Sequence, residues 1–269
     1  MDEERFDRAC QLKDDGKLEE SLQEFINIAN DTDDCDDKPA AILYAAACLK
    51  MMGDWQRAKE QLDIVRLLVA DSNPESENPE RAECLRIAVA FEEGDILGGE
   101  GRSEEALAAF SSLLSSFAEQ LREPFFRSLY EMTQMRRAFL LVDLGRWRDG
   151  LPILEEAGSF ERHDGSVEFY LGYSYVASGD RIRVGAKLRK SLQMGLPKHL
   201  EYRAHCELGR NYHKLEDYEL AKLELEKCAQ TADPNYIRQS QLWRWIEVTC
   251  RHLGLKREAE HYRQLANPS

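Results

Sequence analysis

The chain has 269 residues, and its content of 43% hydrophobic and 9% aromatic side chains is typical of a folded protein and excludes a largely disordered one. The formal charge of −14, from 36 Lys and Arg against 50 Asp and Glu, disfavours nucleic acid as a ligand because its phosphates would be repelled. This charge is uneven, since residues 1–130 hold 14 basic and 30 acidic side chains, whereas residues 131–269 hold 22 and 20. The second half of the chain can therefore still attract an acidic ligand.

The start of the chain and its apolar runs indicate a protein without a membrane partner. Residues 1–10, MDEERFDRAC, lack the basic and apolar regions of a secretory signal. The longest apolar run, AAILYAAACL at 40–49, is too short to span a bilayer. We expect a cytoplasmic protein whose seven scattered cysteines, with no Cys-x-x-Cys pair among them, are mostly reduced.

Apolar residues recur at spacings of three and four almost throughout, which predicts helices along the whole chain. A pattern of small, large and turn-forming residues also returns at intervals. It divides the chain into seven helical repeats, over residues 2–30, 39–71, 80–122, 125–160, 165–197, 201–234 and 236–266. Each repeat centres on one residue of its first helix, in order Ala9, Ala46, Gly94, Ala138, Gly172, Gly209 and Glu247.

Three stretches depart from the regular spacing. Polar residues at 30–39 and 71–80 predict loops between helices. The aspartates at 30–39 lack the glycine and glutamate of an EF-hand, so we interpret them as part of a solvated connection. Residues 103–124 keep helical periodicity beyond the usual length and end at Pro124, which predicts lengthened helices in the third and fourth repeats.

The sixth repeat shows the pattern clearly, with Leu208, Gly209 and Tyr212 before a turn and Ala221 and Leu225 after it. A small residue such as Gly209 lets two helices cross closely, and a large one such as Tyr212 fills the space beside the crossing. The pattern resembles that of the tetratricopeptide repeat family, whose unit is a pair of antiparallel helices of about 34 residues.

The resemblance implies an all-α fold, a right-handed α-solenoid of antiparallel helix pairs that spans residues 1–269 as a single domain. It also implies that the first helices of successive pairs line a concave groove, which in this family commonly holds an extended peptide. The chain is therefore expected to be a protein-protein interaction scaffold.

No constellation of residues indicates catalysis or a cofactor. The six histidines show no HExxH or clustered Cys/His spacing, and the sequence has neither a GxSxG elbow nor a Walker A loop. The glycine-rich run GDILGGEGRS at 94–103 follows a helical segment and holds acidic residues, so we interpret it as the turn of the third repeat. We predict that the protein is not an enzyme and needs no metal or cofactor.

The predicted peptide-binding groove uses the residues beside the packing positions of the first helices. These are basic in the sixth and seventh repeats and largely aromatic or apolar in the fourth and fifth, which favours an acidic peptide or protein segment as the partner. The predicted site comprises Arg203, Arg210, His213, Lys214, Arg244, Arg251, Phe139, Phe169, Tyr170 and Tyr173. Alternatively, the aromatic residues serve packing, and the arginines are solvated or paired with Glu207 and Glu247.

Two other functions stay open at this point. A degenerate last repeat that carries Trp243 and Trp245 favours a module that self-associates into homo-oligomers, because the end of a solenoid must be covered by polar surface or by another chain. RNA binding by helical repeats is disfavoured by the charge of −14 and by the lack of basic residues along every repeat.

Overall fold

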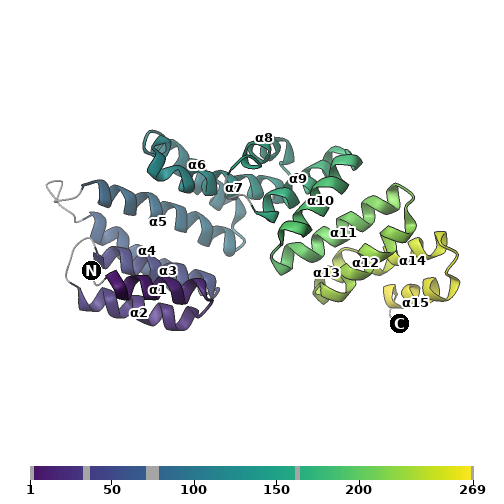
Figure 1. Ribbon diagram of the computed structural model, residues 1–269, viewed down its shortest axis with the longest axis horizontal. Coiled ribbons are helices and arrows are strands. Elements are labelled where there is room, and N and C mark those ends of the chain that lie inside the picture. Colours follow the sequence, from purple (N-terminus) through teal and green to yellow (C-terminus); the bar gives the residue numbers. More distant parts are fainter. Residues whose placement is uncertain (1–2, 33–36, 71–78, 161–163, 268–269) are drawn as a thin grey trace. The chain divides into compact units, whose positions relative to one another are not determined.

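The structure is a computed structural model that describes residues 3–32, 37–70, 79–160 and 164–267. These residues form fifteen α-helices and two short 3-10 helices and include no strand, so the predicted all-α fold of paired helices is confirmed (Figure 1). The loops predicted at 30–39 and 71–80 lie largely outside the described residues.

The chain divides into two compact units, Met1–Leu140 and Leu141–Ser269, here called the N-terminal and the C-terminal unit. The expectation of one domain over residues 1–269 stays a prediction. The N-terminal unit contains α1 (Glu3–Asp14), α2 (Leu18–Asp31), α3 (Asp37–Met51), α4 (Trp55–Ala70), α5 (Pro79–Gly99), α6 (Ser103–Ser116), the 3-10 helices Gln120–Arg122 and Pro124–Phe126, and most of α7 (Arg127–Asp143).

The C-terminal unit begins within the last turn of α7. It contains α8 (Trp147–Ala157), α9 (Gly165–Ser178), α10 (Arg181–Met194), α11 (Lys198–Lys214), α12 (Tyr218–Thr231), α13 (Pro234–Gln239), α14 (Leu242–His252) and α15 (Lys256–Ala266). Helices α9, α11 and α14 are the first helices of three successive pairs, and α10, α12 and α15 are their second helices.

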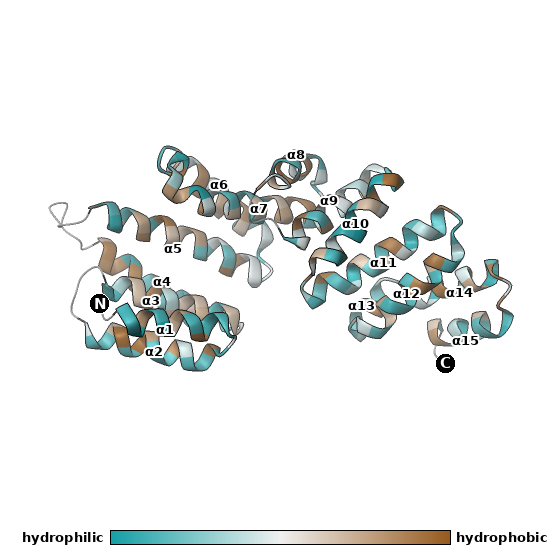
Figure 2. Ribbon diagram, viewed as in Figure 1, coloured by the Kyte–Doolittle hydropathy of each residue, from teal (hydrophilic) through white to brown (hydrophobic). Residues whose placement is uncertain are grey.

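Small residues allow the two helices of a pair to cross closely. A Cβ atom added to Gly209 on α11 would lie 2.7 Å from Cγ of Leu225 on α12, and one added to Gly94 on α5 would lie 2.6 Å from Cε1 of Phe110 on α6. Leu225 and Phe110 are buried, so neither can move aside without cost. Figure 2 shows that hydrophobic and hydrophilic residues alternate along the helices, which gives most of them one side to bury against a neighbour.

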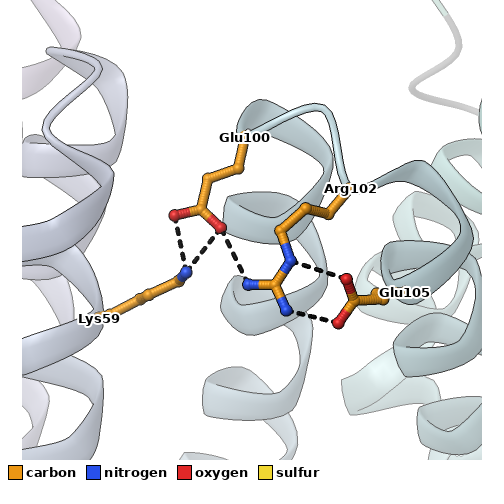
Figure 3. Close-up of polar contacts among 4 residues, drawn as sticks. All are labelled: Lys59, Glu100, Arg102 and Glu105. Carbon is orange, nitrogen blue, oxygen red and sulfur yellow. Dashed lines mark hydrogen bonds and ion pairs between the residues drawn. The ribbon is translucent and has the colours of Figure 1, made fainter.

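Charged side chains join the second pair of helices to the third (Figure 3). Lys59 on α4 donates to both carboxylate oxygens of Glu100, each at 2.6 Å, and Arg102 donates to Glu100 at 3.2 Å and to the two oxygens of Glu105 at 2.8 and 2.5 Å. The hydrogen bond from Lys59 holds the pKa of Glu100 below its ordinary value. Two cations and two carboxylates thus neutralise one another at this turn.

The third repeat differs from the prediction of a helix that continues to Pro124. Helix α6 ends at Ser116, and the 3-10 helix Gln120–Arg122 follows after Phe117. Ser115 donates its hydroxyl proton to the carbonyl of Ser112 at 3.0 Å, a local bond that competes with the helical ladder. The lengthened helices of this region are instead α5, with 21 residues, and α7, with 17.

Candidate peptide-binding face

The predicted site residues from Phe169 to Arg251 lie on α9, α11 and α14, the first helices of the C-terminal unit. Phe139 lies on α7 in the N-terminal unit and is half-buried there. We call the surface formed by α9, α11 and α14 the first-helix face of the C-terminal unit.

Arg203 packs against aromatic side chains of the preceding pair. Its guanidinium lies 5.4 Å from the ring centroid of Phe169 and 5.4 Å from that of Tyr173, distances at which a cation is attracted to an aromatic face. Asp143 accepts a hydrogen bond from Arg203 at 3.4 Å and another from the hydroxyl of Tyr170 at 2.7 Å. Burial and the charge of Asp143 raise the pKa of Tyr170, so this hydroxyl keeps its proton. Arg203 is therefore a neutralised cation.

The predicted aromatic residues are unequally accessible. Phe169 is fully buried and Tyr170 is 6% exposed, so these rings are not surfaces that a peptide could contact. The Tyr170 ring packs against that of Phe169, with 5.2 Å between the centroids. Tyr173 is half-buried, and its side chain reaches the surface beside Val176 and Ala177. Of these three aromatic residues, only Tyr173 borders a hollow on the first-helix face.

Arg210 is fixed by contacts on two sides. It donates to Glu207 at 2.6 Å and to the backbone carbonyl of Ser240, and its guanidinium lies 5.6 Å from the ring centroid of Trp245. The Ser240 carbonyl is available because the chain breaks between α13 and α14, where Gln241 adopts the left-handed conformation at φ 54°. Arg210 is thus held in one place and does not move freely in solvent.

A hollow of about 520 Å³, the Trp245 hollow, opens beside Arg210. It is lined by residues of α9, α11 and α14 and of the connection from α13 to α14, among them Tyr173, Lys214 and Trp245. Lys214 is exposed and makes no ion pair within the described part of the chain. The one carboxylate that lines the hollow, Glu207, already pairs with Arg210, so the hollow keeps an excess of positive charge.

His213 lies on the other side of Trp245, among aromatic rings. Its Nδ1 atom is 2.9 Å from the hydroxyl of Thr249, and its ring centroid is 5.3 Å from that of Trp245 and 5.5 Å from that of His252. Burial, together with the charge of His252, lowers the pKa of His213. The ring is therefore neutral at pH 7, and His213 adds no charge to the basic band.

Arg244 and Arg251 border a second, larger hollow of about 720 Å³, which we call the arginine hollow. Arg244 is exposed and has no ion pair among the described residues, whereas Arg251 contacts Glu247 at 2.5 Å. Gln241 lines both hollows. The predicted basic band therefore divides between two adjoining surfaces.

Several residues of these surfaces were not among those predicted. Arg238 and Arg263 also line the arginine hollow, and the Ser240 carbonyl helps to hold Arg210. The position of Arg263 could have been noticed, because it stands 38 residues after the apolar Leu225 of the preceding repeat. No group of three or more His, Cys, Asp or Glu side chains suited to a metal ion lies among the described residues.

Comparisons with known proteins place the fold. Residues 40–72 and 202–235 each match a model of the tetratricopeptide repeat. No curated protein matches the sequence. The structure is similar to the apo form of the quorum sensor NprR from B. thuringiensis, with 15% identity and a TM-score of 0.72 over 98% of this chain and 74% of that one.

Two further solved structures share the fold. PilF of Pseudomonas aeruginosa is 14% identical, with a TM-score of 0.62 over 87% of this chain and 94% of that one. The apo form of RapI is 12% identical, with a TM-score of 0.64 over 98% of this chain and 74% of that one. Helix pairs joined in series, with two of them matched by repeat models, define a helical-repeat scaffold. The chain thus contains tetratricopeptide repeats.

Because it contains tetratricopeptide repeats, the chain is a scaffold for protein or peptide partners in general terms, and proteins built of these repeats are generally not catalytic. In the part of the chain that the structure covers, no helix is both long and apolar enough to cross a bilayer.

Proposed function

We propose that the C-terminal unit binds an acidic segment of a partner protein or peptide along its first-helix face. The segment lies in the Trp245 hollow and extends toward Arg244 and Arg251. Arg203, Arg210 and Tyr173 border its path.

The observation that carries the proposal is an excess of cations around an accessible aromatic ring. Lys214 is exposed at the rim of the Trp245 hollow without an ion pair in the described residues, and Arg210 is held against Trp245. Carboxylates of a ligand would find two positive groups there, and an apolar ligand side chain would find the indole ring.

The arrangement suits moderate affinity. A charge-assisted hydrogen bond contributes about 1.5 to 3 kcal/mol when well made, and an exposed ion pair about 0 to 1 kcal/mol. Micromolar binding corresponds to about −8 kcal/mol and needs a site that is already in place. Arg210 meets that condition because Glu207 and Ser240 hold its guanidinium before any ligand arrives.

Selection from a random peptide library, followed by binding of the selected peptides in solution, tests the proposal. We expect the enriched peptides to be rich in Asp and Glu and to bind more weakly as salt is added, because screening weakens exposed charge pairs. The variant Lys214→Glu should lose this binding. Its matched control, Lys198→Glu, makes the same change at an exposed position of the same helix outside both hollows and should keep it. Enrichment of basic or neutral peptides, or equal binding to both variants, would contradict the proposal.

A further inference from the structure

The arginine hollow is formed by α13, α14 and α15, which Figure 1 shows at the yellow end of the chain. Four arginines line it, Arg238, Arg244, Arg251 and Arg263, against one carboxylate, Glu247, which Arg251 already contacts. Trp243 and the 40% exposed Leu265 add apolar surface. The hollow therefore combines net positive charge with an apolar patch.

The pair α14–α15 repeats the pair α11–α12 with an offset of 38 residues. The backbone N–H of Asp217 donates to Tyr212 at 3.0 Å, and that of Leu255 donates to Cys250 at 2.9 Å in the equivalent turn. The turns also share a left-handed residue, Glu216 at φ 65° and Gly254 at φ 74°. Positions in the two pairs can therefore be compared one by one.

The comparison shows what normally covers this surface. Arg244 and Arg263 occupy the positions of Cys206 and Leu225 in the preceding pair. Cys206 and Leu225 are fully buried in a cluster with residues of the following first helix, such as Ile246. In α14–α15 the same positions carry arginines. Arg244 is exposed without an ion pair among the described residues, and Arg263, whose side chain is 57% exposed, contacts Glu260 at 3.3 Å.

An apolar helix could not cover this surface, because burying a guanidinium without a partner costs several kcal/mol. A helix that brings carboxylates could cover it. In the preceding pair, the first helix of the next pair covers the equivalent surface. The occupant of the arginine hollow should therefore be a helix with an acidic face.

The chain itself contains such a helix. On α1, Glu3, Glu4 and Asp7 are exposed and make no ion pair within the described residues. Glu3 and Glu4 precede Asp7 by four and three residues, so each lies beside Asp7 on one side of the helix. Over α1 and α2, residues 3–31 hold nine acidic and four basic side chains, whereas residues 234–266, over α13 to α15, hold six basic and three acidic ones.

We propose that the exposed acidic side of α1 in one copy of the protein packs into the arginine hollow of a second copy. The contact joins two different surfaces, so copies add head to tail and form open chains unless the rotation closes a ring. This proposal goes beyond peptide binding in the Trp245 hollow, because it adds α1, α13 and α15 and Arg263, although α14 and Arg244 belong to both surfaces.

Sedimentation velocity of the full chain at rising concentration tests the contact. We expect the wild type to pass from monomer to larger species, and the transition to move to higher concentration when salt is added. Arg244→Glu with Arg263→Glu should lower the association constant by about tenfold or more, since it replaces attraction with repulsion. Glu4→Lys with Asp7→Lys should do the same from the other side of the contact.

A mixture of the two reversed variants separates a specific contact from misfolding. The basic α1 of the Glu4→Lys, Asp7→Lys variant meets the acidic hollow of the Arg244→Glu, Arg263→Glu variant. The native α1 of the second variant meets the native hollow of the first. Association should therefore return in the mixture. Arg257→Glu, an exposed residue of α15 outside the hollow, is the matched control and should associate as the wild type does. A wild type that stays monomeric, or a mixture that does not recover association, would overturn the proposal. Lys214→Glu should leave association unchanged, so failure of the peptide site and failure of this contact are distinguishable.

Discussion

The first helices of the two units carry their charges in different ways. In the N-terminal unit, Lys50 on α3 contacts Glu92 at 2.5 Å and Asp95 at 2.9 Å, and Arg136 on α7 contacts Asp95 at 3.0 Å. Lys50, Glu92 and Asp95 are each less than a fifth exposed. The charges of this network on α3, α5 and α7 are thus satisfied within the unit.

Equivalent positions in the C-terminal unit are not all satisfied in this way. Asp95 directly follows the central Gly94 of its repeat, and Arg210 directly follows the central Gly209. Arg210 pairs with Glu207, but Lys214 and Arg244 have no ion pair among the described residues. The difference teaches that one scaffold can hold a closed charge network in one unit and a face with unsatisfied cations in the other. Of these two arrangements, only the second offers unpaired cations to an acidic ligand.

The largest expected effect concerns the close crossing of paired helices, which both units contain. Gly94→Val and Gly209→Val should each destabilise their own unit by about 2 to 3 kcal/mol, because the added atoms overlap buried Phe110 and Leu225. Urea unfolding measured by circular dichroism checks this.

Gly98→Ala on α5 is the matched control, since its Cβ would lie 3.9 Å from Ala106 and therefore in ordinary contact. If the valine variants are as stable as this control, the close crossing at the centre of the repeat is not required.

The next largest effect on stability distinguishes the paired charges around Lys50 in the N-terminal unit from the unpaired Lys214 in the C-terminal unit. Lys50→Met should cost about 2 kcal/mol, because it leaves Glu92 largely buried without a cation and leaves Asp95 with Arg136 alone. Lys214→Met should change the free energy of unfolding by no more than about 0.5 kcal/mol, since no partner is lost. The same urea experiment measures both, and equal losses would remove the distinction between a closed and an open face.

A smaller effect is expected from pH. The pKa of His213 is lowered in the folded state by burial and by His252, so folding favours the neutral ring. The resulting stability is present above the ordinary pKa of about 6.5 and is lost as the pH falls through the lower, folded-state value. The described part of the N-terminal unit contains no histidine, so acidification over this range should weaken the C-terminal unit selectively.

Thermal unfolding at pH 7.5 and 5.5 checks this expectation. His213→Gln should reduce the loss of stability on acidification. An unchanged pH dependence in that variant would show that His213 is not the group responsible.

The sequence could predict the repeat because its signals are local. Gly209, Ala221 and Leu225 recur at fixed spacing, and the structure places Ala221 and Leu225 in the buried contact that Gly209 makes close. The four-residue spacing of Arg210 and Lys214 also predicts that they lie on the same side of their helix, and both line the Trp245 hollow.

The rest depends on contacts between residues far apart in sequence. Asp143 neutralises Arg203 across 60 residues, and the break at Gln241 exposes the carbonyl that holds Arg210. The burial of Phe169 likewise depends on packing between helices, which a helical pattern does not specify. The alternative that aromatic residues serve packing therefore describes Phe169 and Tyr170, whereas Tyr173 borders the Trp245 hollow.

The most direct test of the central claim is photo-crosslinking of a selected acidic peptide to the full chain, with the modified residues located by mass spectrometry. The account predicts adducts on α11, on α14 and on the connection from α13 to α14, around Lys214 and Trp245. Adducts concentrated on α3 and α5, around Lys50 and Asp95, would contradict it.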